Sequence, residues 1–280
     1  TLTSRNNLAY AYYAAGRLDE AIPLYEQVLA DSVRVLGDDH PQTLTSRNNL
    51  AYAYYAAGRL DEAIPLYEQV LADSVRVLGD DHPQTLTSRN NLAYAYQAAG
   101  RLGEAIPLFE EVLADRVRVL GPDHPHTLTS RNNLAYAYYA AGRLDEAIPL
   151  YEQVLADSVR VLGDDHPQTL TSRNNLAYAY QAAGRLGEAI ALYEQVLADC
   201  VRVLGADHPH ALASRGSLAG AYESAGRLDE AITLYEGVLA DTRRVLGADH
   251  PSTLASRRNL EAARRARESG SASAPGVAEE

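Results

Sequence analysis

The sequence repeats itself every 42 residues, and this period constrains the fold more than any other feature. The full units are 1–42, 43–84, 85–126, 127–168, 169–210 and 211–252. The first, second and fourth are identical; a half unit at 253–268 and a polar tail at 269–280 follow. A fixed period of this size is typical of stacked supersecondary units that contact their sequence neighbours. We therefore expect one repeat array over 1–268, without separate globular domains, and a disordered tail.

Each unit contains two segments with helical signals. In the second unit, a proline at the first turn predicts a helix over Pro41–Ala56, which Gly58 ends. A second helix is predicted over Asp61–Leu78. Gly79 follows it, at the position where a helix commonly ends with a residue of positive φ. Apolar residues recur at three- to four-residue spacing over faces too wide for one helix pair to bury. The pattern predicts an all-α solenoid in which neighbouring pairs cover these faces.

The unit also carries the motif N-N-L-A-x-A-Y-x-x-A-G-R-L-x-E-A-I-x-L-Y-E-x-V-L. It resembles the tetratricopeptide repeat, whose signature positions are held here by Leu8, Ala9, Tyr12, Gly16, Leu18, Ala21, Tyr25 and Val28. The eight residues beyond the ordinary repeat correspond to about one extra turn per helix. Together with L-G-x-x-H-P, the motif is similar to the long variant of kinesin light chains and many bacterial proteins. The resemblance implies a right-handed α-α superhelix of helical hairpins.

Composition excludes several classes of function. The net charge of −12 argues against a broad surface for binding nucleic acids or anionic membranes. The arginines at 257–267 fit a terminal helix with one solvent-exposed face. No apolar run approaches the ~20 residues of a membrane span. A single cysteine cannot form an internal disulfide, which fits a reducing compartment, so we expect a cytoplasmic protein. The first residue falls inside a repeat, so we expect a piece of a longer chain.

Neither catalysis nor cofactor binding is predicted. The same Asp-His pair recurs at successive inter-repeat turns, as at Asp39-His40, Asp81-His82 and Asp165-His166. A catalytic site is one asymmetric constellation, whereas identical turns indicate a structural task, namely starting the next helix. His124 and His126, on either side of a proline, are poorly placed for one tetrahedral metal ion. We assign Cys200 no role, and we expect no enzyme activity, metal or cofactor.

Adjacent asparagines in the middle of the first helix are the strongest functional signal. The Asn side chain competes for backbone hydrogen bonds and is unfavourable in the middle of a helix. Its repetition in successive units therefore indicates a structural or functional role. By resemblance, the second Asn of each pair faces an inner groove and its amide binds the backbone of an extended peptide. The residues are Asn7, Asn49, Asn91, Asn133 and Asn175, with Asn6, Asn48, Asn90, Asn132 and Asn174 beside them. The alternative is that duplication copied the pairs, with the first Asn bonding a neighbouring repeat.

Tyrosines divide into two groups. Tyr12, Tyr25 and their equivalents match core positions, with hydroxyls at the edge of the stack. The others lie off that stripe and are candidates for the groove. They occupy the position of Tyr10, as Tyr10, Tyr52, Tyr94, Tyr136 and Tyr178, and the position of Tyr13, as Tyr13, Tyr55, Gln97, Tyr139 and Gln181. Position 13 varies within an otherwise constant repeat, as either a ligand-facing or a solvent-facing site would.

The sequence favours a protein interaction scaffold that binds an extended peptide segment in the concave groove. The cations that clamp a terminal carboxylate in resembling arrays are absent from the first five units, so an internal segment is the expected ligand. The alternative is a sensor or autoinhibitory arm of a larger bacterial signalling NTPase, because such arrays often follow a nucleotide-binding domain. Self-association through exposed repeat ends is a further expectation, since Leu2, Leu8 and Tyr12 would lack a covering repeat.

Overall fold

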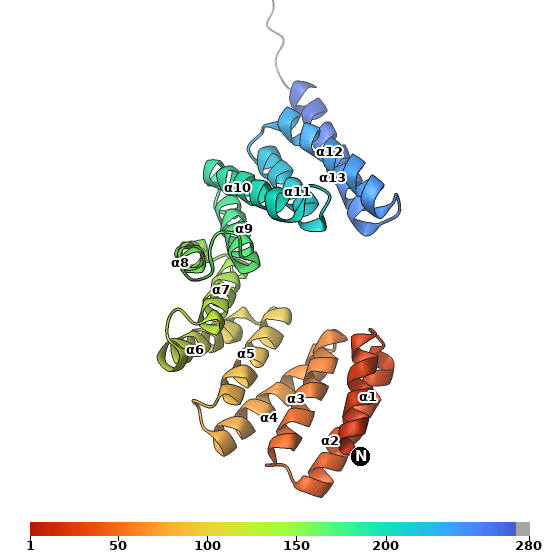
Figure 1. The fold of residues 1–280 in the computed structure, drawn as a ribbon, viewed down its shortest axis with the longest axis vertical. Helices are drawn as coiled ribbons and strands as arrows, with labels where there is room; N and C mark the ends of the chain where they lie inside the picture. The colour runs from red at the N-terminus through yellow and green to blue at the C-terminus, as the bar shows by residue number, and fades with distance from the viewer. Residues whose placement is uncertain (273–280) are drawn as a thin grey trace, which may run out of the picture. The chain divides into compact units, whose positions relative to one another are not determined.

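The computed structural model describes residues 1–272, where every regular element is an α-helix (Figure 1). The helices are α1 (Leu2–Ala14), α2 (Leu18–Leu36), α3 (Pro41–Ala56), α4 (Leu60–Leu78), α5 (Pro83–Ala98), α6 (Leu102–Leu120), α7 (Pro125–Ala140), α8 (Leu144–Leu162), α9 (Pro167–Ala182), α10 (Leu186–Leu204), α11 (Pro209–Ser224), α12 (Leu228–Leu246) and α13 (Pro251–Ala272). They form two compact bodies: an N-terminal body, 1–143, with α1 to α7, and a C-terminal body from Leu144, with α8 to α13. The predicted all-α hairpin solenoid is confirmed.

Local sequence signals set the helix boundaries. Helix α3 spans the predicted residues, and α4 begins one residue earlier than predicted, at Leu60. His40 is the N-cap of α3, and its Nδ1 accepts a hydrogen bond of 3.1 Å from the backbone N–H of Gln42. Gly58 and Gly79 have φ angles of 73° and 87°, a region that side chains with a Cβ rarely adopt. The turn histidine thus starts the next helix, as its repetition indicated.

The core of each hairpin combines small residues with large aromatic ones. Ala51 of α3 and Ala63 of α4 are fully buried, and this lets the two helices approach closely. Tyr67 is buried beside them, and burial raises the pKa of its hydroxyl. Tyr54 lies at the edge of the stack, where its hydroxyl donates to Oε1 of Glu26 in the preceding hairpin at 2.5 Å. Consecutive helices within each body therefore pack side by side through the predicted core positions.

Ion pairs join each hairpin to the turn before it. Arg47 of α3 is almost fully buried, and it donates to Asp73 of α4 at 2.7 Å and to Asp38 of the preceding turn at 2.9 Å. Arg76 of α4 donates to Asp39 of the same turn, which holds the pKa of that carboxyl below its ordinary value. A single repeat boundary is thus held by two arginines of one hairpin and two neighbouring aspartates.

The C-terminal end differs from the sequence expectation. Helix α13 continues to Ala272, beyond Glu268, where the repeat array was predicted to end. Its next residues are small, and the Ser269 hydroxyl donates to the carbonyl of Ala266 at 2.9 Å within the helix. No proline stands in this stretch to stop the helix. The rest of the predicted tail, 273–280, lies outside the described residues.

The two exposed ends of the array differ in their packing. On α1, Leu8 is exposed, whereas the equivalent Leu50 of α3 is buried against the preceding hairpin. Self-association through this face remains a prediction. At the other end, Leu260 and Ala263 of α13 pack onto α12 and are buried. Across residues 1–272, no helix is both long and apolar enough to cross a membrane.

Candidate functional site

The paired asparagines of the N-terminal body bond to one another across repeat boundaries. In each case the second Asn of one repeat donates its amide Nδ2–H to the Oδ1 of the first Asn in the preceding repeat. These bonds run from Asn49 to Asn6 at 3.2 Å, from Asn91 to Asn48 at 3.1 Å and from Asn133 to Asn90 at 3.5 Å. We call this set the Asn ladder. The alternative in which the first Asn bonds a neighbouring repeat is therefore realised, and it explains why the helix keeps two unfavourable residues.

The ladder uses only part of each amide. A primary amide has two N–H donors and two acceptor lone pairs, and each ladder bond uses one donor of one Asn and one lone pair of the other. Asn49 and Asn91 are partly buried, and Asn133 is buried. Asn132, Asn174 and Asn175 are also partly buried, while Asn7 is exposed. A groove role for the remaining donors and acceptors stays a prediction.

Tyrosine rings lie beside the Asn ladder on α1 and α3. The ring centroids of Tyr10 and Tyr13 are 6.3 Å apart, those of Tyr13 and Tyr52 are 5.4 Å apart, and those of Tyr52 and Tyr55 are 6.3 Å apart. Tyr10 and Tyr52 are exposed. A hydrogen bond with Tyr52, together with burial, raises the pKa of Tyr13 to about 12. The four rings form an aromatic strip in which Tyr10 and Tyr52 are exposed and Tyr13 and Tyr55 are half-buried, and we call it the Tyr strip.

The remaining predicted tyrosines do not all share this arrangement. Tyr136 is exposed and stacks on Tyr139 at 6.2 Å, as in the Tyr strip. Tyr94 is partly buried and packs edge-on against Phe109 at 5.3 Å. In the C-terminal body, Tyr178 packs edge-on against Tyr193 at 5.5 Å. The predicted groove positions are therefore brought together on the first helices within each body, but their exposure differs between repeats.

The side chain at position 13 of the repeat has different hydrogen-bond partners in different units. In the fifth unit, Oε1 of Gln181 accepts from the Tyr193 hydroxyl at 3.2 Å. In the third unit, the equivalent of Tyr193 is Phe109, which has no hydroxyl, and Oε1 of Gln97 is buried without a hydrogen-bond partner. A buried unpaired acceptor costs about 1–3 kcal/mol. The Oε1 of Gln97 is thus enclosed although its side chain is half-buried, and a groove role for Gln97 stays a prediction.

Replacing Phe109 by Tyr is expected to raise the free energy of unfolding by about 1 kcal/mol, because the new hydroxyl supplies the donor that Gln97 lacks. Urea unfolding measures the change through its midpoint at constant m-value. The reverse substitution, Tyr193→Phe, is the matched control and is expected to destabilise by a similar amount. A lower midpoint for Phe109→Tyr would show that the hydroxyl finds no room in this hairpin.

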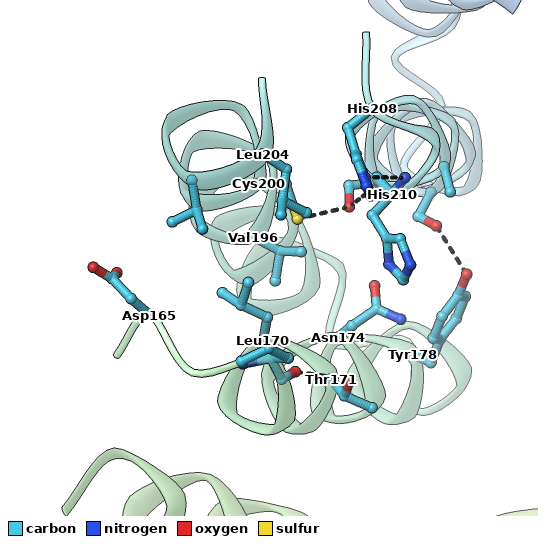
Figure 2. Close-up of a pocket in the computed structure, with 15 residues that line it drawn as sticks. Asp165, Leu170, Thr171, Asn174, Tyr178, Val196, Cys200, Leu204, His208 and His210 are labelled. Carbon is cyan, nitrogen blue, oxygen red and sulfur yellow. Dashed lines mark hydrogen bonds between the residues drawn. The ribbon is translucent and has the colours of Figure 1, made fainter. Parts of the chain in front are cut away.

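The C-terminal body contains a cavity of about 460 Å³ between α9, α10 and α11 (Figure 2). Leu170 and Val196 form an apolar wall of the cavity, and the buried Cys200 also lines it. The Sγ of Cys200 accepts a hydrogen bond from the Ser214 hydroxyl at 3.7 Å. The hydroxyls of Tyr178 and Ser217 bond each other at 2.8 Å at one side. We assign Cys200 no role from the sequence, which does not reveal this cavity. The available signal was the replacement of Asn-Asn by Gly-Ser at 216–217.

The turn histidines of the C-terminal body cap helices. His208 and His210 line the cavity, and Nδ1 of His208 accepts the backbone N–H of His210 at 3.2 Å as a helix cap. Among residues 1–272, no three or more His, Cys, Asp or Glu side chains are grouped so that they could hold a metal ion.

These features define an all-helical repeat protein with an amide ladder and an aromatic strip on its first helices. The profile of the tetratricopeptide repeat matches residues 1–74, 48–116, 90–157, 132–200, 179–240 and 211–273. The chain therefore belongs to the tetratricopeptide repeat family, whose repeats generally mediate protein–protein interactions. No curated protein matches the sequence significantly.

Solved structures agree with this assignment. The chain is 42% identical to a Podosopora anserina protein described as a kinesin light chain with nearly identical tetratricopeptide-like repeats, with a TM-score of 0.67 over 72% of this chain and 96% of that one. BtubC from P. vanneervenii is 18% identical, with a TM-score of 0.62 over 94% of this chain and 96% of that one. The tetratricopeptide sensor of a signal transduction ATPase from Pyrococcus horikoshii is 14% identical, with a TM-score of 0.73 over 95% of this chain and 39% of that one. The last two likenesses concern the fold.

Proposed function

We propose that the chain is a protein interaction scaffold that binds extended peptide segments on the face formed by the Asn ladder and the Tyr strip. The observation that carries this proposal is the side-by-side placement of unused amide groups and open aromatic faces on α1 and α3. An extended backbone presents alternating N–H and C=O groups, which a primary amide can satisfy. Exposed tyrosine rings offer large contact area at a small cost in conformational entropy.

The charge of the face formed by the Asn ladder and the Tyr strip indicates which kind of ligand to expect. The Tyr strip and the Asn ladder carry no formal charge, because carboxamides do not ionise and tyrosine hydroxyls keep their proton at physiological pH. A terminal carboxylate would need a cation at these positions, and the asparagines supply none. The expected ligand is therefore an internal segment with apolar side chains, bound through its backbone.

Peptides selected from a phage-displayed random decapeptide library on the full chain are expected to include a group that needs the Tyr strip. For this group, the double substitution Tyr10→Ser and Tyr52→Ser is expected to weaken binding at least tenfold, or about 1.4 kcal/mol, because two open ring faces are lost. Fluorescence anisotropy with the labelled peptides measures the dissociation constants.

The matched control is the pair Val35→Ser and Val77→Ser, which removes exposed apolar side chains from the second helices α2 and α4. Circular dichroism should show that both double variants keep the helicity of the parent chain. If no peptide is enriched, or if every peptide binds the Tyr10→Ser, Tyr52→Ser protein as tightly as the parent, the Tyr strip is not a binding surface.

A further inference from the structure

The repeated Asn pair gives way to Gly216 and Ser217 on α11, within the C-terminal body. In the register of the repeat, Asn174 corresponds to Asn48, and Ser217 corresponds to the Asn91 that donates to it. The Ser217 hydroxyl instead bonds the hydroxyl of Tyr178 at 2.8 Å. No hydrogen bond is found for the Asn174 amide among the described residues, so the substitution leaves it available.

The same interruption releases a second amide on the other side of α11. Asn259 of α13 is in the register of Asn91, and its acceptor in the preceding repeat would be residue 216. That residue is Gly216, which has no side chain, and Asn259 is exposed. Two residues of one helix thus free the carboxamides of both neighbouring first helices, Asn174 on α9 and Asn259 on α13.

Open volume accompanies each freed amide. The cavity of about 460 Å³ is lined by Asn174 and Ser217, and a second cavity of about 230 Å³ is lined by Gly216 and Asn259. A Cβ built on Gly216 would meet no atom within 4 Å, so the space beside it is empty rather than closed by a neighbouring helix. Hydrogen-bonding capacity and room for a ligand therefore lie together on both sides of α11.

The walls of the larger cavity indicate which chemical group it would take. Leu170 and Val196 supply apolar surface, and Figure 2 shows the Asn174 side chain directed between α9 and α11, toward His210. Apart from the two histidines, Asp165 is the one lining residue with a formal charge among those described, and Arg202 donates to it at 2.9 Å. The lining contains no Lys or Arg that would attract an anionic ligand, and an apolar group fits the Leu170 and Val196 wall best. An apolar pocket with few polar groups is typical of a specific binding site.

We propose that the interrupted ladder at Gly216 and Ser217 is a specificity site that receives a large apolar side chain of an extended peptide. The side chain occupies the cavity of about 460 Å³, and the Asn174 carboxamide bonds the adjacent peptide group of the ligand. This site rests on the proposed peptide-binding function and gives it a sequence preference. The repeats with an intact Asn ladder bind backbone, whereas this one also selects a side chain.

The test restores the ladder with the chain's own sequence. Gly216→Asn together with Ser217→Asn reproduces the pair found in the other repeats, and the free space around Gly216 accommodates it. Because glycine is unfavourable inside a helix, the repaired protein should be at least as stable as the parent. The two introduced carboxamides are expected to form the missing ladder bonds, one with Asn174 and the other with Asn259. The repaired protein should therefore lose the binding site without loss of folding.

Peptides from the random decapeptide library are measured on the parent, on the repaired protein and on Asn174→Ala. We expect one group of peptides to share a large apolar residue and to bind both variants at least tenfold more weakly than the parent. Thermal unfolding of the repaired protein should not occur at a lower temperature. Equal affinity of all peptides for the parent and the repaired protein would overturn the specificity site.

The outcome for the specificity site is separable from that for the general function. Peptides that need Tyr10 and Tyr52 but ignore the repair at 216–217 would support the peptide-binding scaffold and reject the specificity site. Absence of any enriched peptide would reject both. A group that depends on the repair but lacks a shared large apolar residue would reject the assignment of the cavity to a side chain.

Discussion

Replacing Tyr67 by Ala is expected to lower the free energy of unfolding by about 3–5 kcal/mol, the range for truncating a buried aromatic side chain. Tyr67 of α4 is 2% exposed and lies within the N-terminal body, where helices on both sides cover it. Its loss leaves a cavity that the packed helices can close only in part. Urea unfolding followed by circular dichroism measures the change, and hydrogen exchange shows whether the loss spreads to α3 and α5.

Two control substitutions test the cause. Tyr67→Phe keeps the ring and is expected to change stability by less than about 1 kcal/mol, because the third unit already holds Phe109 at this position, 1% exposed. Tyr52→Ala removes an equal side chain that is 47% exposed, and its effect is also expected to stay below about 1 kcal/mol. Similar losses for Tyr67→Ala and Tyr52→Ala would contradict the role of burial.

Replacing Asp73 by Ala is expected to lower the free energy of unfolding by about 3 kcal/mol. The Arg47 side chain is 4% exposed, and Asp73 is its partner at 2.7 Å on the neighbouring helix. Removal of one member of a buried ion pair leaves the other charge without compensation, which costs about 3–5 kcal/mol. Asp38 still bonds Arg47 at 2.9 Å, so we expect the lower end of this range. Urea unfolding again measures the effect.

The identical first unit provides the matched control, Asp31→Ala. Asp31 pairs with Arg5 as Asp73 pairs with Arg47, but the Arg5 side chain is 40% exposed. An ion pair open to solvent contributes about 0–1 kcal/mol, so the control should cost no more than that. Equal losses at Asp31 and Asp73 would mean that burial of the arginine does not determine the contribution of the pair.

The local architecture could be predicted from the sequence because its causes are local. A proline at the first turn and a glycine at the end bound α3 within the predicted residues Pro41–Ala56. The repeat period predicted stacked hairpins, and the 3.6-residue periodicity predicted that Tyr67 would be buried. Each of these signals acts within one unit or is copied unchanged from unit to unit, so no knowledge of the packing is required.

The pairing of side chains between repeats was decided by the tertiary structure. The family resemblance predicts that Asn49 faces the groove. Its hydrogen bond to Asn6 joins residues 43 positions apart, and only the stacking of α1 on α3 brings them within 3.2 Å. For the same reason, the sequence alone does not reveal the effect of Gly216 and Ser217, because the amide that they leave unpaired, Asn174, belongs to the preceding unit. A repeat sequence determines the hairpin, whereas the donors and acceptors left for a ligand depend on the neighbouring hairpins.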